Sequence, residues 1–314
     1  MIFERSFDDL TCEDVALLNE YFHGYNYQSS AHTFLASYIW RNTHHLSWQI
    51  IGEYLCLAAR GDFEGESVYF MSFPLTRTGT YDADKLRDTI MEAKKIFGER
   101  NQTLEISLIP GQMLPLLAEA LGEDGYELER CRDDDDYIYL KEDLISLSGR
   151  RYHQKKNHLN FFLRNYEYVY EEATPDMKDE IWEYIQSKNE YKMGETPEEW
   201  KEILEMENVA IKELLNFIGK GILCGVIRIG GEIVAVTMGE FARPDKEMVL
   251  VHVEKADDRI RGLYQAINNE FCKRLPKETI YVNREEDMGL ETLRQTKLSY
   301  RPHFMNEKFS AIVK

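Results

Sequence analysis

The strongest constraint on the fold is an order of segments that occurs twice along the chain, as a hairpin followed by alternating helices and strands. In the first half the predicted elements are strands at 54–59 and 67–73, a helix at 84–98, a strand at 103–109, a helix at 113–121 and paired strands within 126–140. In the second half they are strands at 222–229, 232–241 and 248–254, a helix at 260–275, a strand at 279–283, a helix at 290–298 and a strand at 309–313. This repeated pattern predicts two similar α/β domains.

The domain boundaries follow from the repeat. We expect an N-terminal domain at residues 1–145 and a C-terminal domain at residues 146–314. A chain of 314 residues, 43% of them hydrophobic, is long enough to bury two cores. A helical insertion is expected between the repeats, because Thr196-Pro197-Glu198-Glu199 combines a capping box with proline at the first helical position.

The distribution of charge singles out one segment. The formal net charge is −18, yet residues 144–166 contain no acidic residue. The cations of this segment are Arg150, Arg151, Lys155, Lys156 and Arg164. Because the overall field of an acidic protein repels polyanions, a local basic patch of this kind indicates a docking site for a phosphate-bearing partner. The alternative is a solvated basic helix face that acidic residues elsewhere neutralise.

Several classes of protein are not expected. The first ten residues lack the apolar run of a signal peptide, and no stretch approaches about 20 apolar residues, so we expect a cytoplasmic chain without stable membrane insertion. The five cysteines are scattered without a CxxC pair, which is typical of reduced thiols. The eight histidines show no metal-ligand spacing, so no metal is assigned.

A second unusual feature lies at the start of the helix predicted at 260–275. Arg259 and Arg261 fall near its first turn, where the helix dipole disfavours cations. Gly262 is placed inside the helix, where glycine costs about 1 kcal/mol relative to alanine. Both features are explained if the helix N-terminus binds a phosphate through backbone N–H groups. The alternative is that Asp257 and Asp258 cap the helix and pair with the arginines.

The same segment resembles a known family motif. Arg259-x-x-Gly262-x-Tyr264 resembles the Arg/Gln-x-x-Gly-x-Gly/Ala turn that holds the acyl-CoA pyrophosphate in the GNAT acyltransferase superfamily. The resemblance implies that Arg259, Arg261, Gly262, Leu263 and Tyr264 bind the acyl donor. Tyr264 departs from the pattern, because CoA-binding members have a small residue there, and a tyrosine would crowd the pyrophosphate.

Longer segments carry a more specific resemblance. Residues 149–162, 251–271 and 281–309, with 34–41, are similar to soluble bacterial proteins related to the C-terminal catalytic domain of phosphatidylglycerol lysyltransferase. The resemblance covers nearly the whole chain. It implies two tandem GNAT-like domains of mixed α/β sheets, a fold shared with the FemABX aminoacyltransferases.

The resemblance also implies a class of substrates. The acyl donor would be aminoacyl-tRNA or acyl-CoA, and the acceptor a small molecule with an amine or a hydroxyl group. Arg150, Arg151, Lys155 and Lys156 would then meet the phosphates of a tRNA acceptor end.

Candidate substrate-binding residues follow the strand predicted at 279–283. They are Asn283, Arg284, Glu285 and Glu286. Ligands of open α/β sheets bind beyond the carboxyl ends of strands. There the carboxylates can hold an amino group, and Arg284 can orient them or bind a carboxylate. The alternative is that the acidic residues only cap the next helix.

Candidate catalytic residues lie on the neighbouring strand. His252 and Glu254 share one face because strand side chains alternate, and either can serve as the base. Tyr300 or Tyr264 can serve as the acid. His252 has a second interpretation as a core histidine that is already hydrogen-bonded.

Two classes of function remain open. The first is an acyl- or aminoacyltransferase, and the second is a non-catalytic ligand-binding module on the same fold. The C-terminal domain is expected to carry the active cleft. The N-terminal domain lacks the turn motif and is expected to be structural.

Overall fold

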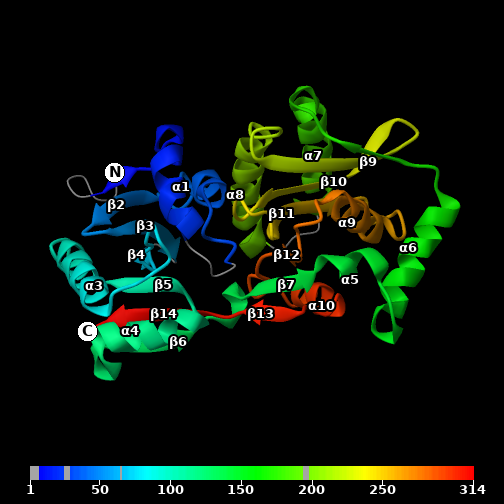
Figure 1. The fold of residues 1–314 in the computed structure, drawn as a ribbon. Helices are drawn as coiled ribbons and strands as arrows, with labels where there is room; N and C mark the ends of the chain where they lie inside the picture. Colours follow the sequence, from blue (N-terminus) through cyan, green and yellow to red (C-terminus); the bar gives the residue numbers. More distant parts are fainter. Residues whose placement is uncertain (1–6, 25–28, 64–65, 194–197) are drawn as a thin grey trace. The chain divides into compact units, whose positions relative to one another are not determined.

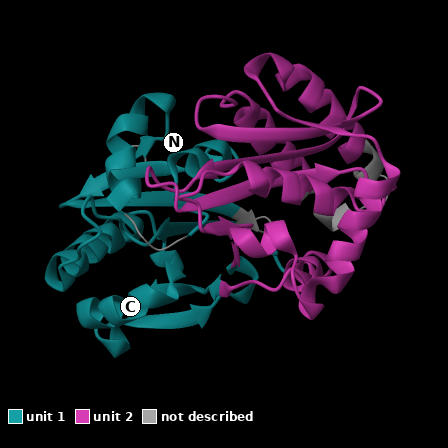
Figure 2. Ribbon diagram, turned by 45° about the vertical axis from the view of Figure 1, so that its right-hand side comes forward, with its two compact units in different colours: residues 1–136, 286–289, 305–314 teal, residues 137–285, 290–304 magenta. Residues whose placement is uncertain are grey.

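The computed structural model describes residues 7–24, 29–63, 66–193 and 198–314, in two compact units (Figures 1 and 2). Unit 1 comprises residues 1–136, 286–289 and 305–314, and unit 2 comprises residues 137–285 and 290–304. Neither unit is one continuous segment. The observed division therefore differs from the continuous ranges expected from the sequence, 1–145 and 146–314.

Unit 1 is built on a seven-stranded mixed sheet with the order β1-β2-β3-β4-β5-β14-β6. Its strands are β1 (Asp8–Asp9), β2 (Ser47–Ile51), β3 (Tyr54–Phe63), β4 (Glu66–Ser72), β5 (Glu105–Pro110), β6 (Tyr126–Arg130) and β14 (Lys308–Val313). Its helices are α1 (Val15–Gly24), α2 (Phe34–Trp40), α3 (Ala83–Gly98) and α4 (Leu114–Leu121). Strands β4 and β5 are parallel, because α3 connects them and returns the chain to the end of the sheet at which β4 begins.

The core of unit 1 confirms the helical period read from the sequence. Leu86, Ile90, Ala93 and Phe97 of α3 are fully buried, and they pack into one apolar cluster with side chains of β3, β5 and β14. The Asp82 side chain starts α3 by accepting a hydrogen bond from the Lys85 N–H. Burial of this apolar face stabilises the helix on the sheet.

Unit 2 repeats the plan with the strand order β13-β7-β12-β11-β10-β9-β8. Its strands are β7 (Asp136–Leu140), β8 (Val169–Glu172), β9 (Ile222–Ile229), β10 (Glu232–Phe241), β11 (Met248–Ala256), β12 (Tyr281–Asn283) and β13 (Phe304–Asn306). Its helices are α5 (Lys141–Ser146), α6 (His153–Asn165), α7 (Lys178–Met193), α8 (Glu198–Leu215), α9 (Leu263–Arg274) and α10 (Glu291–Ser299). The parallel pair is β11 and β12, which α9 connects.

Each sheet contains one strand from the other half of the chain. The expectation that residues 126–140 form a strand pair was wrong, because β6 and β7 have different partners. In sheet order, β14 lies between β5 and β6, with Val313 opposite Tyr126. Strand β7 pairs with β12, with Tyr139 opposite Val282. Apolar alternation identifies a strand, but its partner is set by tertiary packing.

The helical insertion of unit 2 consists of α7 and α8. Helix α8 begins at Glu198, and Thr196 and Pro197 of the proposed capping box lie outside the described residues. Among the helices that the structure describes, none is long and apolar enough to cross a membrane.

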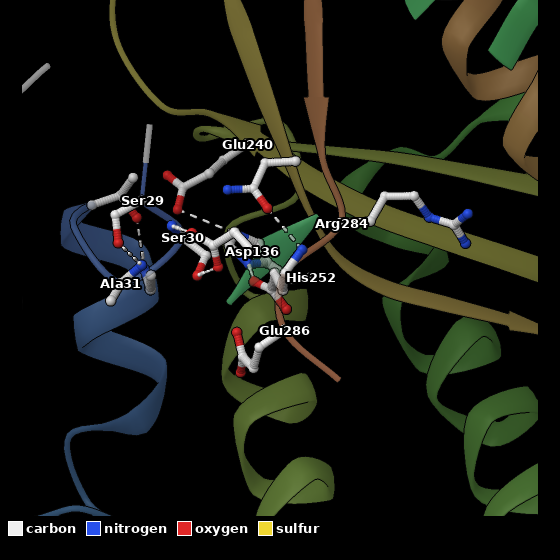
Figure 3. Close-up of polar contacts among 12 residues, drawn as sticks. Ser29, Ser30, Ala31, Asp136, Glu240, His252, Arg284 and Glu286 are labelled. Atoms are coloured by element: carbon white, nitrogen blue, oxygen red, sulfur yellow. Dashed lines mark hydrogen bonds and ion pairs between the residues drawn. The ribbon is translucent and has the colours of Figure 1, made fainter. Parts of the chain in front are cut away.

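A buried ion pair ties three segments of unit 1 together. Lys308 Nζ of β14 lies 2.8 Å from Asp136 Oδ1, and both side chains are almost fully buried. The Asp136 carboxylate also accepts hydrogen bonds from the Ser30 N–H and hydroxyl (Figure 3) and from the Asn306 amide. Burial alone would raise the pKa of Asp136, but Lys308 and Ser30 together hold that pKa below its usual value.

A single glycine sets the start of α9. Gly262 is the N-cap residue with a φ of +87°, so its expected place inside the helix was wrong. A Cβ atom at this position would lie 2.2 Å from the carbonyl oxygen of His158 on α6. Glycine is therefore needed both for the backbone conformation and for the close approach of α6.

Replacing Lys308 by methionine should leave the Asp136 carboxylate buried without its cation. Removing one partner of a buried pair costs about 3–5 kcal/mol of unfolding free energy. Urea denaturation should show this loss for Lys308→Met and a partial recovery for Lys308→Met/Asp136→Asn. Lys314→Met, at an exposed pair with Glu127, is the control and should change stability little. A loss below about 1 kcal/mol in Lys308→Met would contradict a stabilising role for the pair.

The packing role of Gly262 can be separated from its backbone strain. Gly149 has nearly the same φ, +86°, but an added Cβ would meet no atom within 4 Å. Gly149→Ala should therefore lower the free energy of unfolding only through its unfavourable backbone conformation. Gly262→Ala should lower it by about 1–3 kcal/mol more, because the added Cβ overpacks against α6. Thermal unfolding of the two variants measures the difference. Equal losses would show that α6 does not constrain this position.

Candidate functional site

The predicted site residues of unit 2 meet beyond the end of β12. This strand ends at Asn283, which is level with Leu250 of β11 in the parallel register. The residues that follow it therefore run alongside His252 and Glu254 of β11. Ligands of α/β sheets bind beyond strand ends of this kind.

His252 is held between two carboxylates. Its Nδ1 lies 2.7 Å from Glu285 Oε1, and its Nε2 lies 3.1 Å from Glu240 Oε1 (Figure 3). Burial alone would lower the pKa of His252, but the two carboxylates outweigh it and raise the pKa to about 10. At neutral pH the ring is therefore an imidazolium that donates through both nitrogens, and a role of His252 as the base stays a prediction.

Glu240 was not identified from the sequence. It lies near the end of β10 in the run Ala235–Phe241, most of which is buried. A carboxylate in such a strand needs a partner, because an unpaired buried charge is costly. From the sequence, this rule could have indicated that Glu240 has a partner. Only the pairing of β10 with β11 shows that the partner is His252.

Glu254 and Arg284 form the second pair. Arg284 Nη2 lies 2.8 Å from Glu254 Oε1, and the Asn268 amide donates to Glu254 Oε2 at 3.1 Å. The guanidinium carbon lies 4.9 Å from the ring centroid of Tyr300. Arg284 Nη1 is buried and has no hydrogen-bond partner among the residues that the structure describes.

Lys155 brings the basic segment to the same cluster. Its Nζ lies 4.3 Å from the centroid of the Tyr300 ring. Burial, followed by the charge of Arg284, lowers the pKa of Lys155 to about 8, and Glu254 opposes the shift. Burial raises the pKa of Tyr300 to about 12, against the charge of Arg284, so the phenol is protonated at neutral pH.

The turn after β12 orients these groups. The fully buried Asn283 accepts a hydrogen bond from the Glu285 N–H through its Oδ1, at 2.7 Å. Glu285 has a φ of +59°, a conformation that non-glycine residues seldom adopt. The Asn283 side chain stabilises this strained turn, which directs Glu285 toward His252 and Arg284 toward Glu254.

The remaining cations of the basic segment are more exposed. Arg151 pairs with Asp143 at 2.8 Å, and Lys156 Nζ donates to the Ser146 carbonyl oxygen at 3.1 Å. Arg150 is exposed at the start of the short 3-10 turn before α6. Arg261 joins this surface, because its guanidinium lies 4.5 Å from the ring of Phe161 on α6.

The loop before α9 already contains an internal carboxylate. The Asp257 side chain accepts hydrogen bonds from the Arg259 N–H and from its guanidinium, and Lys188 Nζ lies 3.0 Å from Asp257 Oδ1. Hydrogen bonding from Arg259 is the main reason why the pKa of Asp257 is far below its usual range. This arrangement matches the alternative in which Asp257 pairs with an arginine.

Leu263 and Tyr264, which follow this loop at the start of α9, differ in their burial. The Leu263 N–H bonds to the Ile260 carbonyl oxygen, and the Leu263 side chain is buried. Burial raises the pKa of Tyr264, which is only partly accessible. A donor-binding role for Arg259, Arg261, Gly262, Leu263 and Tyr264 stays a prediction.

Glu286 belongs to unit 1. Its carboxylate lies 4.0 Å from Lys308 Nζ, in the surroundings of the buried pair with Asp136. The sequence did not identify Lys308 or Asp136 as partners of Glu286. No group of three or more metal-ligating side chains occurs within residues 7–24, 29–63, 66–193 and 198–314.

The chemistry of the unit 2 cluster follows from its charges and donors. Arg284 and Lys155 place positive charge and N–H donors at one strand edge, whereas Glu285 and Glu240 engage the N–H groups of His252. Preorganised donors in a poorly hydrated site stabilise negative charge that develops on an oxygen atom, such as a carbonyl or phosphate oxygen. The arrangement therefore suits a reaction that passes through an oxyanion.

Comparison with solved structures supports the fold. A conserved protein of unknown function from Bacteroides thetaiotaomicron is 28% identical, with a TM-score of 0.87 over 98% of this chain and 99% of that one. The structure of L-PGS from Bacillus licheniformis is 14% identical, with a TM-score of 0.64 over 98% and 93%. FemX is 8% identical, with a TM-score of 0.64 over 98% and 97%. The chain thus shares its fold with L-PGS and FemX, as the resemblance to the FemABX aminoacyltransferases implied.

Comparison of sequences supports the family. An uncharacterized protein of Mycoplasmoides gallisepticum is 25% identical over 179 residues, which span 55% of this chain and about half, 54%, of that relative's length. The family model described as "Phosphatidylglycerol lysyltransferase, C-terminal" matches residues 22–312. The chain therefore belongs to the phosphatidylglycerol lysyltransferase C-terminal family.

Proposed function

We propose that the protein transfers an aminoacyl group from aminoacyl-tRNA to the amine or hydroxyl group of a small acceptor. The reaction takes place at the cluster of Arg284, Glu254, His252, Lys155 and Tyr300 in unit 2. Family membership supports the class of reaction, and the similarity to FemX supports the fold on which it occurs. The observation that carries the proposal is the unpaired Nη1 of the buried Arg284.

Arg284 is suited to bind the acyl carbonyl oxygen. A buried donor without a partner costs about 1–3 kcal/mol, more if it is charged, so a substrate oxygen that accepts from Nη1 removes a penalty. Glu254 holds Nη2 and fixes the direction of Nη1. The bond to Nη1 strengthens as negative charge builds up on the carbonyl oxygen, which lowers the barrier to acyl transfer.

His252 contributes charge, because its high pKa prevents it from accepting a proton at neutral pH. Its two ring nitrogens lie against the Glu285 and Glu240 carboxylates. Carboxylates at this strand edge suit an ammonium group, such as the α-amino group of an aminoacyl ester, while Arg284 suits its carbonyl oxygen.

The donor is assigned to tRNA on two grounds. Asp257 already occupies the amide and guanidinium of Arg259, where the GNAT motif would hold the pyrophosphate of CoA. The exposed cations Arg150, Lys156 and Arg261 offer a positive surface beside α6 in a protein of net charge −18. Such a surface suits a polyanion whose phosphates are spread over many ångströms.

Arg284→Lys tests the transfer reaction directly. The full chain is incubated with total tRNA charged with radioactive amino acids, and with phosphatidylglycerol vesicles, spermidine and hydroxylamine as acceptors. The wild type should accelerate transfer, and Arg284→Lys, which keeps one charge but loses the guanidinium geometry, should lower kcat by about 100-fold. Arg87→Lys, at an exposed pair in unit 1, is the control and should behave as wild type.

Two results would contradict the proposal. Acceleration with acetyl-CoA but not with charged tRNA would assign a different donor. Binding of charged tRNA without transfer to any of the three acceptors would favour a ligand-binding module on the same fold.

The charge of His252 can be read by NMR titration of the histidine ring, with His252→Gln identifying the resonance. The ring should keep its proton until the pH approaches about 10. Because the folded pKa lies above the usual value of about 6.5, the stabilisation from His252 is fully present below pH 6.5 and is lost as the pH rises through 10. Glu285→Gln should lower the transition, and a wild-type transition near 6.5 would show that the carboxylates do not hold the ring charged.

A further inference from the structure

We propose that Lys155 accepts the proton of the attacking acceptor group and later returns it to the departing oxygen. This inference rests on the proposed transfer reaction at the same cluster. It assigns the step for which the sequence suggested His252 or Glu254.

Both sequence-based candidates for the base are already engaged. His252 uses both ring nitrogens against carboxylates. Glu254 uses one oxygen for Arg284 and the other for the Asn268 amide. His252 as an imidazolium has no free lone pair, and protonation of Glu254 would weaken its ion pair with Arg284. A base must reach the proton that it removes, so the geometry disfavours both.

Lys155 differs from them in having no such partner. In the described part of the chain its Nζ makes no hydrogen bond or ion pair, and it lies over the face of the Tyr300 ring, 4.3 Å from the ring centroid. The buried Lys255 and Lys308, by contrast, pair with Glu207 and Asp136 at 2.8 Å. A partly buried lysine without a carboxylate is unusual in a protein with 56 acidic residues.

The groups around Lys155 explain why it can be neutral. Arg284, on the turn after β12, disfavours its charge, whereas Glu254 on β11 favours it. The aromatic face of Tyr300 gives a cation weak compensation for lost water. His158, one turn along α6, has a pKa lowered by burial and by nearby cations. With a pKa of about 8, roughly a quarter of Lys155 is neutral at pH 7.5.

The proposed step balances in atoms and electrons. The lone pair of neutral Lys155 takes the proton from the acceptor hydroxyl or amine while the acceptor oxygen or nitrogen bonds to the acyl carbon. Arg284 Nη1 holds the carbonyl oxygen as it becomes an oxyanion. The ester C–O bond then breaks. The departing ribose oxygen takes the proton from the Lys155 ammonium group, and Lys155 becomes a neutral amine again. No oxidant, reductant or further reactant is needed.

The experiment compares wild type, Lys155→Arg, Lys155→Ala and the control Lys95→Ala. Lys95 lies on α3 of unit 1, is exposed, and pairs with Glu92 at 3.3 Å. Transfer from charged tRNA is measured between pH 6 and 9 with the acceptor that the wild type uses. The wild-type kcat should rise with pH and level off above a pKa of about 8. Both Lys155 variants should lose about 100-fold or more of kcat and this pH dependence, and Lys95→Ala should keep both.

Chemical rescue separates proton transfer from a structural role. Trimethylamine carries a basic nitrogen but cannot form a stable amide, so it acts as a base without becoming an acceptor. Added to Lys155→Ala, it should restore transfer at least tenfold, and added to Lys155→Arg it should restore nothing, because the guanidinium fills the space. Rescue would support the assignment.

The experiment distinguishes a wrong role for Lys155 from a wrong transferase activity. If the wild type transfers but Lys155→Ala keeps the wild-type pH profile, or shows no rescue, the role of Lys155 is overturned and the transferase stands. If the wild type does not transfer at all, the transferase is overturned and the role of Lys155 with it.

Discussion

Each sheet of this protein is completed by a strand from the other half of the chain, and most other features depend on this exchange. Strand β14 enters the first sheet and β7 enters the second. The exchange brings Lys308 against Asp136, 172 residues away in sequence, in a buried pair with additional hydrogen bonds. A buried pair is weak as a source of stability, but an unpaired member is costly, so it favours one strand arrangement over others.

In unit 2 the parallel step between β11 and β12 sets the chemistry. The turn after β12 delivers Arg284 to Glu254 and Glu285 to His252. Burial acts on all these groups, but their partners differ. Two carboxylates raise the pKa of His252, whereas an unpaired Lys155 beside Arg284 has a lowered pKa. Burial therefore leaves the His252 ring charged at neutral pH, whereas it allows Lys155 Nζ to exchange a proton.

The Gly262 turn combines a backbone requirement for glycine with an ion pair inside the loop. The glycine adopts a positive φ and starts α9, as a tight turn before a helix requires. The carbonyl oxygen of His158 on α6 leaves no room for a Cβ atom at Gly262. Arg259, the cation of the motif, binds the carboxylate of Asp257 in the same loop. Sequence alone could not distinguish a phosphate from an internal carboxylate as the partner of the arginine, because both are anions that accept the same N–H donors.

Local patterns in the sequence predicted the helices and strands of the repeated order in both halves of the chain. Apolar periodicity depends on local geometry, so Leu86 to Phe97 and the 222–241 hairpin were predictable. The alternation of β11 also placed His252 and Glu254 on one face. Tertiary structure alone decided the strand exchange, the partnership of His252 with Glu240, and the isolation of Lys155 from carboxylates. These depend on which distant segments pack together, and local patterns carry no information about the burial and charge that distant neighbours supply.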